Sequence, residues 1–335
     1  MKKKIFALLI AVFFTGTMAS GCGTEEKAAS ASHVEKKLTF GYVDSGASFP
    51  NDITGIAIDQ GYFEEELSKA GYKFEAVPFT GAGPAINEAM VNGSIDIAVT
   101  GDVPAIIGKS NGVEDTLIGA ELQFNDAALV VLASSDIHSV SDLKGKTVAT
   151  LQGSYMHKTL INMLEAEGLS IEDVQFTSMP SADAAVAVEA GAVDAAVVAN
   201  TQEAAIANSE NVRIVENCEK HPEWKGGHAF IARDEYLTEG KEAAVAFLKA
   251  VRRAQKYALE NYDSAIETLA KSGATAEVYR FFFPDEVNLN LSGGDEVLPV
   301  YEGIVEFLIN NELIKNEPDL TTWFDKSIWE AAKLD

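Results

Sequence analysis

The sequence predicts an α/β protein made of two lobes, and three observations lead to this expectation. Strand-like and helix-like segments alternate along the whole chain. Two strand–turn–helix units follow each other within residues 77–106, with the spacing of ordinary α/β units. The length of 335 residues exceeds the usual size of one domain, and a hydrophobic content of 47% is sufficient for a substantial core.

The segment 77–106 also predicts where a ligand binds. A strand ends near Phe79, and a Gly/Pro turn at residues 81–84 then opens a helix that ends at Gly93. A second strand, at residues 95–99, leads into Thr100-Gly101-Asp102, after which Pro104 starts another helix. Each helix start offers unpaired N–H groups and a positive dipole end, and ligand clefts of open α/β sheets lie at the carboxyl ends of the strands. We therefore expect a small-molecule cleft that accepts a negatively charged group.

The first lobe is expected over residues 38–133, completed by residues 231–335 after the chain returns. Its remaining expected strands and helices are strands at 38–43, 116–123 and 127–132 and helices at 53–61, 62–70, 241–270, 298–310 and 322–332. Glycines follow several of these helices as stop signals, and the long helix has its apolar residues spaced along one face. Residues 287–291 are expected to be irregular.

The second lobe is expected over residues 134–230. Its expected elements are strands at 147–151, 174–179, 193–198, 212–215 and 226–232, the last of which returns to the first lobe, and helices at 155–167, 183–190 and from 200 onward. The apolar run 193–198 is typical of a parallel strand buried on both faces. Two chain crossings, near residues 131–134 and 229–233, predict a hinge between the lobes.

The first 22 residues are interpreted as a lipoprotein signal peptide. Three lysines precede a short apolar stretch at residues 5–14, and Ala19-Ser20-Gly21-Cys22 resembles a lipidation site with Ala where Leu is usual. The alternative is an ordinary secretory signal in which Cys22 is incidental. Polar residues 23–37 then read as a flexible tether, so we expect an exported protein, lipid-anchored to the outer face of the bacterial cytoplasmic membrane or in the periplasm.

The charge and the cysteine and histidine content argue against a nucleic-acid partner, a disulfide, a metal site and a cofactor. The formal net charge is −25, which excludes nucleic acid as a partner because phosphate binding requires clustered Lys and Arg. Once Cys22 is lipidated, Cys218 has no partner, so no disulfide is expected and Cys218 is interpreted as a small buried hydrophobe. The five histidines lack metal-ligand spacing and no nucleotide-binding loop occurs, so no metal and no cofactor are predicted.

Four motifs resemble one known family of proteins in order and in spacing. Residues 83–104 read G-P-A-I-N-E-A-M-V-N-G-S-I-D-I-A-V-T-G-D-V-P, residues 139–146 read S-V-S-D-L-K-G-K, residues 153–157 read G-S-Y-M-H, and residues 190–195 read A-G-A-V-D-A. These resemble the extracytoplasmic solute-binding proteins for aliphatic sulfonates, taurine and nitrate. The resemblance covers residues 38–335 and weakens after residue 233. It implies a type II periplasmic-binding-protein-like fold, with two α/β lobes joined by a two-crossing hinge that close on a ligand.

Candidate ligand-binding residues lie at strand-to-helix transitions on one edge of the two predicted sheets. They are Gly81, Ala82, Thr100, Gly101, Asp102, Ser154, Asn200 and Thr201, with Asp44 and Ser45 after the first strand. Ordinary helix capping explains any one of them equally well, and the helix dipole alone explains an acid at Asp102. The resemblance implies a cleft-facing residue at Asp102, and a cleft-facing His157 that donates a hydrogen bond. The stretch 46–52 departs from the family pattern and leaves the ligand open.

The resemblance implies a monomeric receptor that delivers its ligand to the permease and ATPase of an ABC importer. Asp44 and Asp102 are compatible with an amino-sulfonate such as taurine, and equally with a nitrogenous ligand such as a pyrimidine vitamin precursor. An enzyme on the same fold is the second hypothesis. Ser154 and His157 are adjacent on one helix face, but no acid in a matching motif and no nucleophile elbow accompany them, so we expect no enzyme. A sensory or adhesive lipoprotein is the third hypothesis.

Overall fold

The structure is a computed structural model that describes residues 36–334 except Asn208. The expected signal peptide, Cys22 and the tether up to residue 35 lie outside these residues. Among the helices described, none is both long and apolar enough to cross a membrane.

The first lobe, lobe A, is built on a six-stranded sheet with strand order β11-β4-β10-β3-β1-β2. Its strands are β1 (Lys36–Val43), β2 (Tyr72–Phe79), β3 (Ile97–Gly101), β4 (Asp115–Asn125), β10 (Gly226–Arg233) and β11 (Leu291–Ser292). β1, β2 and β3 are mutually parallel, while β10 runs antiparallel to both β3 and β4. β4 therefore points in the same direction as β3.

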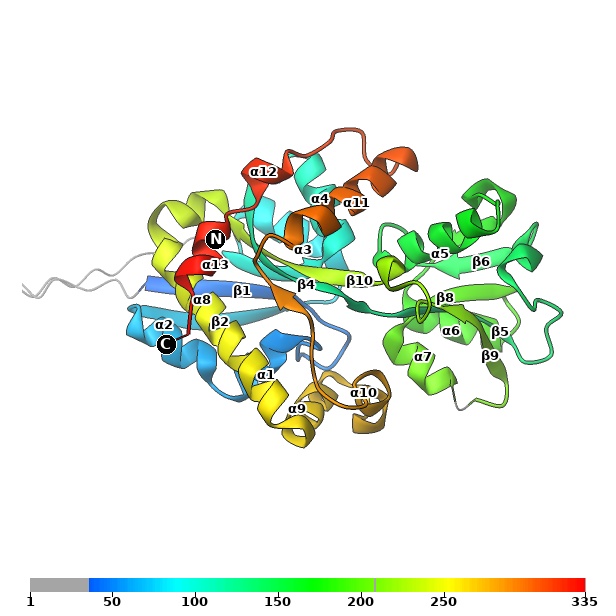
Figure 1. Ribbon diagram of the computed structural model, residues 1–335, viewed down its shortest axis with the longest axis horizontal. Coiled ribbons are helices and arrows are strands. Elements are labelled where there is room, and N and C mark those ends of the chain that lie inside the picture. Colours follow the sequence, from blue (N-terminus) through cyan, green and yellow to red (C-terminus); the bar gives the residue numbers. More distant parts are fainter. Residues whose placement is uncertain (1–35, 208, 335) are drawn as a thin grey trace, which may run out of the picture. The chain divides into compact units, whose positions relative to one another are not determined.

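Helices cover both faces of this sheet because its strands alternate apolar residues between the two faces. On β10, Phe230 and Ala232 join a core with α1, α2, α8 and α9, while Ala229 and Ile231 join a second core with α3, α4, α11 and α12 (Figure 1). The helices of lobe A are α1 (Ile53–Asp59), α2 (Tyr62–Lys69), α3 (Ala82–Asn92), α4 (Asp102–Ser110), α8 (Asp234–Glu260), α9 (Tyr262–Leu269), α10 (Ala276–Phe282), α11 (Val297–Asn310), α12 (Leu320–Trp323) and α13 (Lys326–Ala331).

The second lobe, lobe B, is built on a five-stranded sheet with strand order β7-β6-β8-β5-β9. Its strands are β5 (Ala127–Leu132), β6 (Thr147–Thr150), β7 (Gln175–Ser178), β8 (Ala195–Ala199) and β9 (Val212–Asn217), and its helices are α5 (Tyr155–Ala166), α6 (Ser181–Glu189) and α7 (Asn200–Ile206). Short 3₁₀ turns lie at Val140–Leu143, Ile171–Asp173 and Pro222–Trp224, and a fourth lies in lobe A at Ala270–Ser272. β5 supplies Leu129 to the core under α5 and Val130 to the core under α6.

The predicted fold class, two α/β lobes, is confirmed, but three expectations about the chain path are wrong. β5 was expected in the first lobe, yet it pairs with β8 and β9 in the sheet of lobe B. An apolar run of six residues fits either sheet, so its sequence does not identify its partners. The first crossing therefore lies at residues 125–127, not at 131–134. The second lies at residues 218–225, not at 229–233, because β10 belongs entirely to lobe A.

The third correction concerns the C-terminal helices. The helix expected over residues 241–270 starts earlier, at Asp234, and breaks at Asn261, whose φ of −134° and ψ of 58° are not helical. The helix expected over 322–332 is the two short helices α12 and α13. Leu291, the last residue of the stretch expected to be irregular, forms the short edge strand β11 on β4 together with Ser292. Helical periodicity continues across such breaks, so it does not locate them.

Candidate functional site

The strand topology brings the carboxyl edges of the two sheets together. In lobe A, β4 ends at Asn125, which pairs with Gly226 at the start of β10, and β10 then places His228 beside Gly101 at the end of β3. In lobe B, Ala127 at the start of β5 pairs with Ala199 at the end of β8. Asn125 and Ala127 are two residues apart, so the edge that ends β3 and the edge that ends β8 meet at the crossings. We call this region, around Asn125, Asp126 and residues 218–227, the lobe junction.

Helices start at both edges directly after their strands. α3 and α4 follow β2 and β3 in lobe A, and α5 and α7 follow β6 and β8 in lobe B. A helix N-terminus carries unpaired N–H groups and about half a positive charge. The residues predicted at the strand ends therefore lie on the two sheet edges that meet at the lobe junction. The sequence predicted that they gather on such an edge.

Close packing brings the starts of α3 and α4 to the same point. A Cβ on Gly83 of α3 would lie 2.2 Å from the Cβ of Pro104 and 3.4 Å from the Oγ1 of Thr100. No side chain fits there, so only glycine permits this approach. Next to Gly83, Ala82 has a φ of 52°, a left-handed conformation that is costly for a residue with a Cβ. Gly101 precedes α4 as its N-cap residue.

Thr100 is the predicted residue with the most unusual surroundings. It is 1% exposed, and its Oγ1 is buried without any hydrogen-bond partner. An unpaired buried hydroxyl costs about 1–3 kcal/mol, so such groups are rare in folded proteins. The hydroxyl lies between the starts of α3 and α4, at the carboxyl end of β3.

Asp102 is buried at the start of α4, and both of its carboxylate oxygens accept backbone hydrogen bonds. Oδ1 accepts from Val103 N at 2.7 Å, and Oδ2 accepts from Gly227 N at 2.8 Å. Burial raises the pKa of this carboxyl, while Lys158 nearby acts in the opposite direction. Asp102 therefore fixes the start of β10 to the start of α4, which is a structural role that the sequence did not indicate.

The predicted residues of the loop after β1 are Asp44 and Ser45, and the side chain of Asp44 bonds within its own loop. Asp44 is buried, and its Oδ1 accepts from Gly46 N at 2.9 Å and from Ser48 N at 2.8 Å. Ser45 is exposed. The carboxylate of Asp44 thus folds its own loop, the Asx-turn arrangement that short acidic side chains favour.

In lobe B, Ser154 and His157 take part in local structure. Ser154 caps α5, and its Oγ donates to Leu151 O at 2.6 Å. His157 was expected to face the cleft and donate a hydrogen bond. Instead it is buried against Phe176, with ring centroids 4.9 Å apart, and its Nδ1 accepts from Gly153 N. Burial lowers the pKa of His157 to about 4, so the ring is neutral at pH 7. Apolar neighbours from β7, which no sequence motif indicates, draw the ring into the core.

Asn200 links the two lobes directly. Its Nδ2 donates to Asn125 Oδ1 at 3.3 Å, and its Oδ1 accepts from Thr201 N, while Thr201 Oγ1 donates to Gln202 Oε1. Asn125 in turn contacts His228 Nε2 at 3.3 Å. A chain of polar contacts therefore runs from α7 in lobe B to β4 and β10 in lobe A.

Glu121 and His228 continue this chain into lobe A, and the sequence analysis missed Glu121. Their Oε2 and Nδ1 lie 2.7 Å apart, and Glu121 Oε1 accepts from Ile53 N at 3.1 Å. Burial raises the pKa of Glu121 to about 7, although His228 opposes the shift. Burial is the largest single influence on the pKa of His228 and would lower it. The hydrogen bond and charge of Glu121, with the charges of Asp52 and Asp102, together outweigh burial and raise the pKa. An acid inside the apolar strand 115–125 was the available signal, because buried acids require partners.

Lys158 is another residue missed, and it brings a buried amino group to the junction. It is 4% exposed, and its Nζ donates to Glu223 O and Lys225 O, both at 3.2 Å, in the second crossing. Burial lowers its pKa, while Asp102 acts in the opposite direction. An ammonium has three donors, and these two carbonyls use two of them. Lys158 immediately follows the G-S-Y-M-H motif and lies four residues after Ser154. Residues four apart share one helix face, and this spacing was the signal available in the sequence.

Asp126 ties the two crossings to each other. Its Oδ1 accepts from Cys218 N at 3.0 Å, and its Oδ2 lies 3.3 Å from Lys225 Nζ. Cys218 is buried, as expected from the sequence, and burial raises the pKa of its thiol to about 12. Within the described part of residues 36–334, no group of three or more His, Cys, Asp or Glu side chains could hold a metal ion.

Comparisons with known proteins agree with this architecture. A protein named an aliphatic sulfonates-binding protein from Bacillus subtilis (strain 168) is 26% identical over 333 residues, 98% of this chain and 97% of that protein. One of the same name from Escherichia coli (strain K12) is 27% identical over 257 residues, 76% of this chain and 79% of its own. These relatives confirm the resemblance read from the four motifs.

Solved structures share the fold. A periplasmic sulfonate-binding protein SsuA of a sulfonate ABC transporter from Methylobacillus flagellatus KT superposes with a TM-score of 0.77 at 22% identity, over 89% of this chain and 93% of that one. The desulfurization enzyme DSZB superposes with a TM-score of 0.68 at 14% identity, over 89% of this chain and 98% of that one. The NMT1/THI5-like family model matches residues 52–265, more than half of the sequence, and the chain belongs to that family.

Proposed function

We propose that this protein is the extracytoplasmic solute-binding component of an ABC importer, and that it holds a small sulfonate at the lobe junction. The observations that support the proposal are a buried amino group at the junction, on Lys158, an unpaired buried hydroxyl on Thr100 at the carboxyl end of β3, and helix starts at the edges of both sheets. A sulfonate offers three oxygen acceptors and one negative charge, which matches these donors. The names of the relatives from B. subtilis and E. coli support the same ligand class.

The proposal also includes delivery of the ligand to a permease and an ATPase, a monomeric state and a lipid anchor at Cys22. The lobes would close on the ligand about the two crossings, which Asp126 binds together. Among the predicted residues, Gly81, Ala82, Gly101 and Asn200 would contribute backbone N–H groups, whereas Asp44, Ser154 and His157 would support the site from behind.

The geometry also favours a binding protein over an enzyme. Ser154 Oγ donates to the carbonyl of Leu151 and not to the ring of His157, so the pair does not form a nucleophile and its base. Cys218, with a thiol pKa of about 12, is not an activated nucleophile. DSZB shows that the fold itself is compatible with catalysis, so this argument rests on these residues and not on the fold.

The test is a ligand screen with a matched pair of variants. Native mass spectrometry of the chain from Gly23 identifies any copurified ligand, and a thermal-shift screen then compares alkanesulfonates, taurine, nitrate and pyrimidines. We expect an alkanesulfonate or taurine to raise the melting temperature by mass action and to be released unchanged. Lys158→Met should weaken its binding by roughly tenfold or more, because a charge-assisted hydrogen bond is lost.

Lys109→Met is the control for this substitution. Lys109 is also partly buried, donates to Asp115 O, and lies in the last turn of α4, at the opposite end from the junction. If only a pyrimidine binds, the alternative ligand class replaces the sulfonate. If Lys109→Met and Lys158→Met reduce sulfonate affinity equally, the junction has been assigned wrongly.

A further inference from the structure

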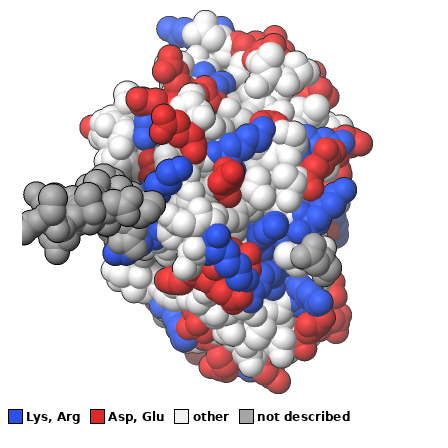
Figure 2. Space-filling model, turned by 90° about the vertical axis from the view of Figure 1, so that its left-hand side faces the viewer, with Lys and Arg blue, Asp and Glu red and all other residues white. Residues whose placement is uncertain are grey.

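A basic groove lies along α8, away from the lobe junction. It has a volume of about 500 Å³ and is lined by α2, α8 and the C-terminal segment. Five of its side chains are basic, Lys69, Lys249, Arg253, Lys256 and Lys333, and two are acidic, Glu66 and Glu260. Lys and Arg side chains gather on this side of the molecule (Figure 2). Such an excess of positive charge is unexpected on a chain whose net charge is −25.

Three of these cations have no partner among the described residues. Lys69 and Arg253 form ion pairs with Glu65 and Glu66 on α2. Lys249, Lys256 and Lys333 form neither an ion pair nor a hydrogen bond within the part of the chain that the structure describes. Unpaired cations that share one groove repel each other, so an anion that enters it gains the attraction of all three.

The spacing along α8 produces this arrangement. Lys249, Arg253 and Lys256 are four and three residues apart and therefore lie in one stripe along the helix. The opposite side of α8 is anchored in the core by buried residues such as Phe247 and Val251. The basic stripe is thus held in a fixed geometry by a rigid helix of 27 residues.

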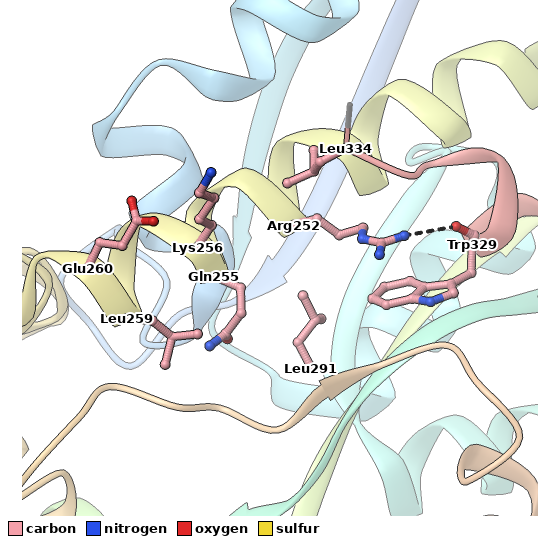
Figure 3. A pocket seen from close by; sticks show the side chains of 8 residues that line it. All are labelled: Arg252, Gln255, Lys256, Leu259, Glu260, Leu291, Trp329 and Leu334. Carbon is pink, nitrogen blue, oxygen red and sulfur yellow. Dashed lines mark hydrogen bonds between the residues drawn. The ribbon is translucent and has the colours of Figure 1, made fainter.

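A second pocket, of mixed polar and apolar lining, adjoins the groove on the same helix (Figure 3). It has a volume of about 350 Å³, and it shares Lys256, Glu260 and Leu334 with the groove. Arg252 lies 4.6 Å from the ring of Trp329, and Leu259 and Leu291 complete the apolar wall. The amide nitrogen and oxygen of Gln255 are buried there without partners. The surface therefore combines unpaired cations with apolar side chains.

The groove lies close to the point where the chain enters the fold. Lys36, the first residue of β1, contacts the hydroxyl of Tyr72, which follows Lys69 by three residues. Cys22 precedes Lys36 by fourteen residues, a segment that spans about 50 Å at most. A lipid on Cys22, as proposed above, would therefore keep Lys36 at the start of β1 within that distance of the bilayer.

We propose that the basic groove binds the phosphate-bearing head groups of an anionic membrane. Phosphate oxygens match the unpaired lysines of the groove. Charges farther away than the Debye length, about 8 Å at physiological salt, are screened, so the acidic remainder of the chain does not prevent this contact. The inference does not depend on the ligand at the lobe junction, and it adds a contact made by the folded lobe to the proposed lipid anchor.

The test uses the chain from Gly23 to Asp335, without the lipid, in vesicle cosedimentation. All four core clusters lie within residues 38–332, so this chain keeps the complete fold. We expect binding to vesicles of equal parts phosphatidylglycerol and phosphatidylcholine, and none to pure phosphatidylcholine. Each lysine near an anionic surface changes the partition coefficient roughly fivefold, so Lys249→Gln/Lys256→Gln/Lys333→Gln should weaken binding about a hundredfold.

Lys144→Gln/Lys271→Gln/Lys315→Gln is the matched control, because it removes the same charge from exposed lysines outside both the groove and the lobe junction. It should bind anionic vesicles like the unchanged protein, and melting curves should show both triple variants folded. Equal losses in the two triple variants would mean that net charge and not the groove governs binding, and would overturn the proposal. Displacement from vesicles by millimolar inorganic phosphate at constant ionic strength would also overturn it, since the groove would then be a site for small anions.

Discussion

Replacing Thr100 with valine should make the ligand-free protein more stable and ligand binding weaker. Valine has nearly the shape of threonine, so the packing around the 1% exposed side chain is retained while the hydroxyl is removed. That hydroxyl is buried without a hydrogen-bond partner between the starts of α3 and α4. The folded protein therefore carries a polar group whose desolvation nothing compensates.

The two effects can be given magnitudes. An unsatisfied buried hydroxyl costs about 1–3 kcal/mol, so its removal should raise the free energy of unfolding by about 1 kcal/mol or more. A hydrogen bond from a hydroxyl to a charged acceptor contributes about 1.5–3 kcal/mol, so the dissociation constant of a sulfonate should rise by roughly tenfold to a hundredfold. A role in packing alone would not move stability and affinity in opposite directions.

Urea denaturation of the ligand-free protein gives the first quantity, and titration calorimetry with the ligand found in the screen gives the second. Thr150→Val is the control, because Thr150 also ends a strand and is fully buried, but its Oγ1 donates to Val197 O at 2.8 Å. That variant should lose about 1 kcal/mol of stability. If Thr100→Val is destabilised as Thr150→Val is, or binds the ligand as tightly as the unchanged protein, the assignment of Thr100 to the ligand is refuted.

Two further predictions concern other parts of the chain. The pKa of Glu121 is raised from 4.5 to about 7 by burial, so its contribution to stability is complete below pH 4.5 and is lost as the pH rises through 7. Glu121→Gln should therefore reduce the fall in melting temperature between pH 5 and pH 8. An unchanged dependence of the melting temperature on pH would contradict the assignment. Cys22→Ala should release the protein from the membrane fraction, as immunoblots of cell fractions will show, and retention at the unchanged level would exclude the lipid anchor.

The sequence predicted the α/β class, most elements and the edge on which candidate residues gather, because these follow from local signals. Hydrophobic periodicity and glycine stops depend on a few neighbouring residues, and the helix starts at Gly81, Gly101 and Ser154 are all found as expected. Sheet membership is not local. β5 is apolar throughout and is buried in lobe B only because Ala127 pairs with Ala199, a partner seventy-two residues away.

The site was harder to predict than the fold for the same reason. A polar residue at a helix start can cap its own helix or face a ligand, and only its partners distinguish the two roles. The oxygens of Asp44, Asp102 and Ser154 are engaged by backbone groups, one of them distant in sequence. Lys158 and Glu121 carry no motif of their own, and their importance comes from burial, which a single sequence shows only as a charge in an apolar surrounding.

Capacity for further hydrogen bonds therefore separates residues that build the junction from residues that can serve a ligand. Asp102 accepts from two backbone N–H groups on different elements, and it fixes the start of β10 against α4. Its charge still lies close enough to Lys158 for each to shift the pKa of the other. An anion bound to Lys158 is therefore either repelled by the carboxylate of Asp102 or carries a positive group that contacts it. The second arrangement describes an amino-sulfonate, so comparing taurine with an alkanesulfonate of equal length measures how much Asp102 contributes to the choice of ligand.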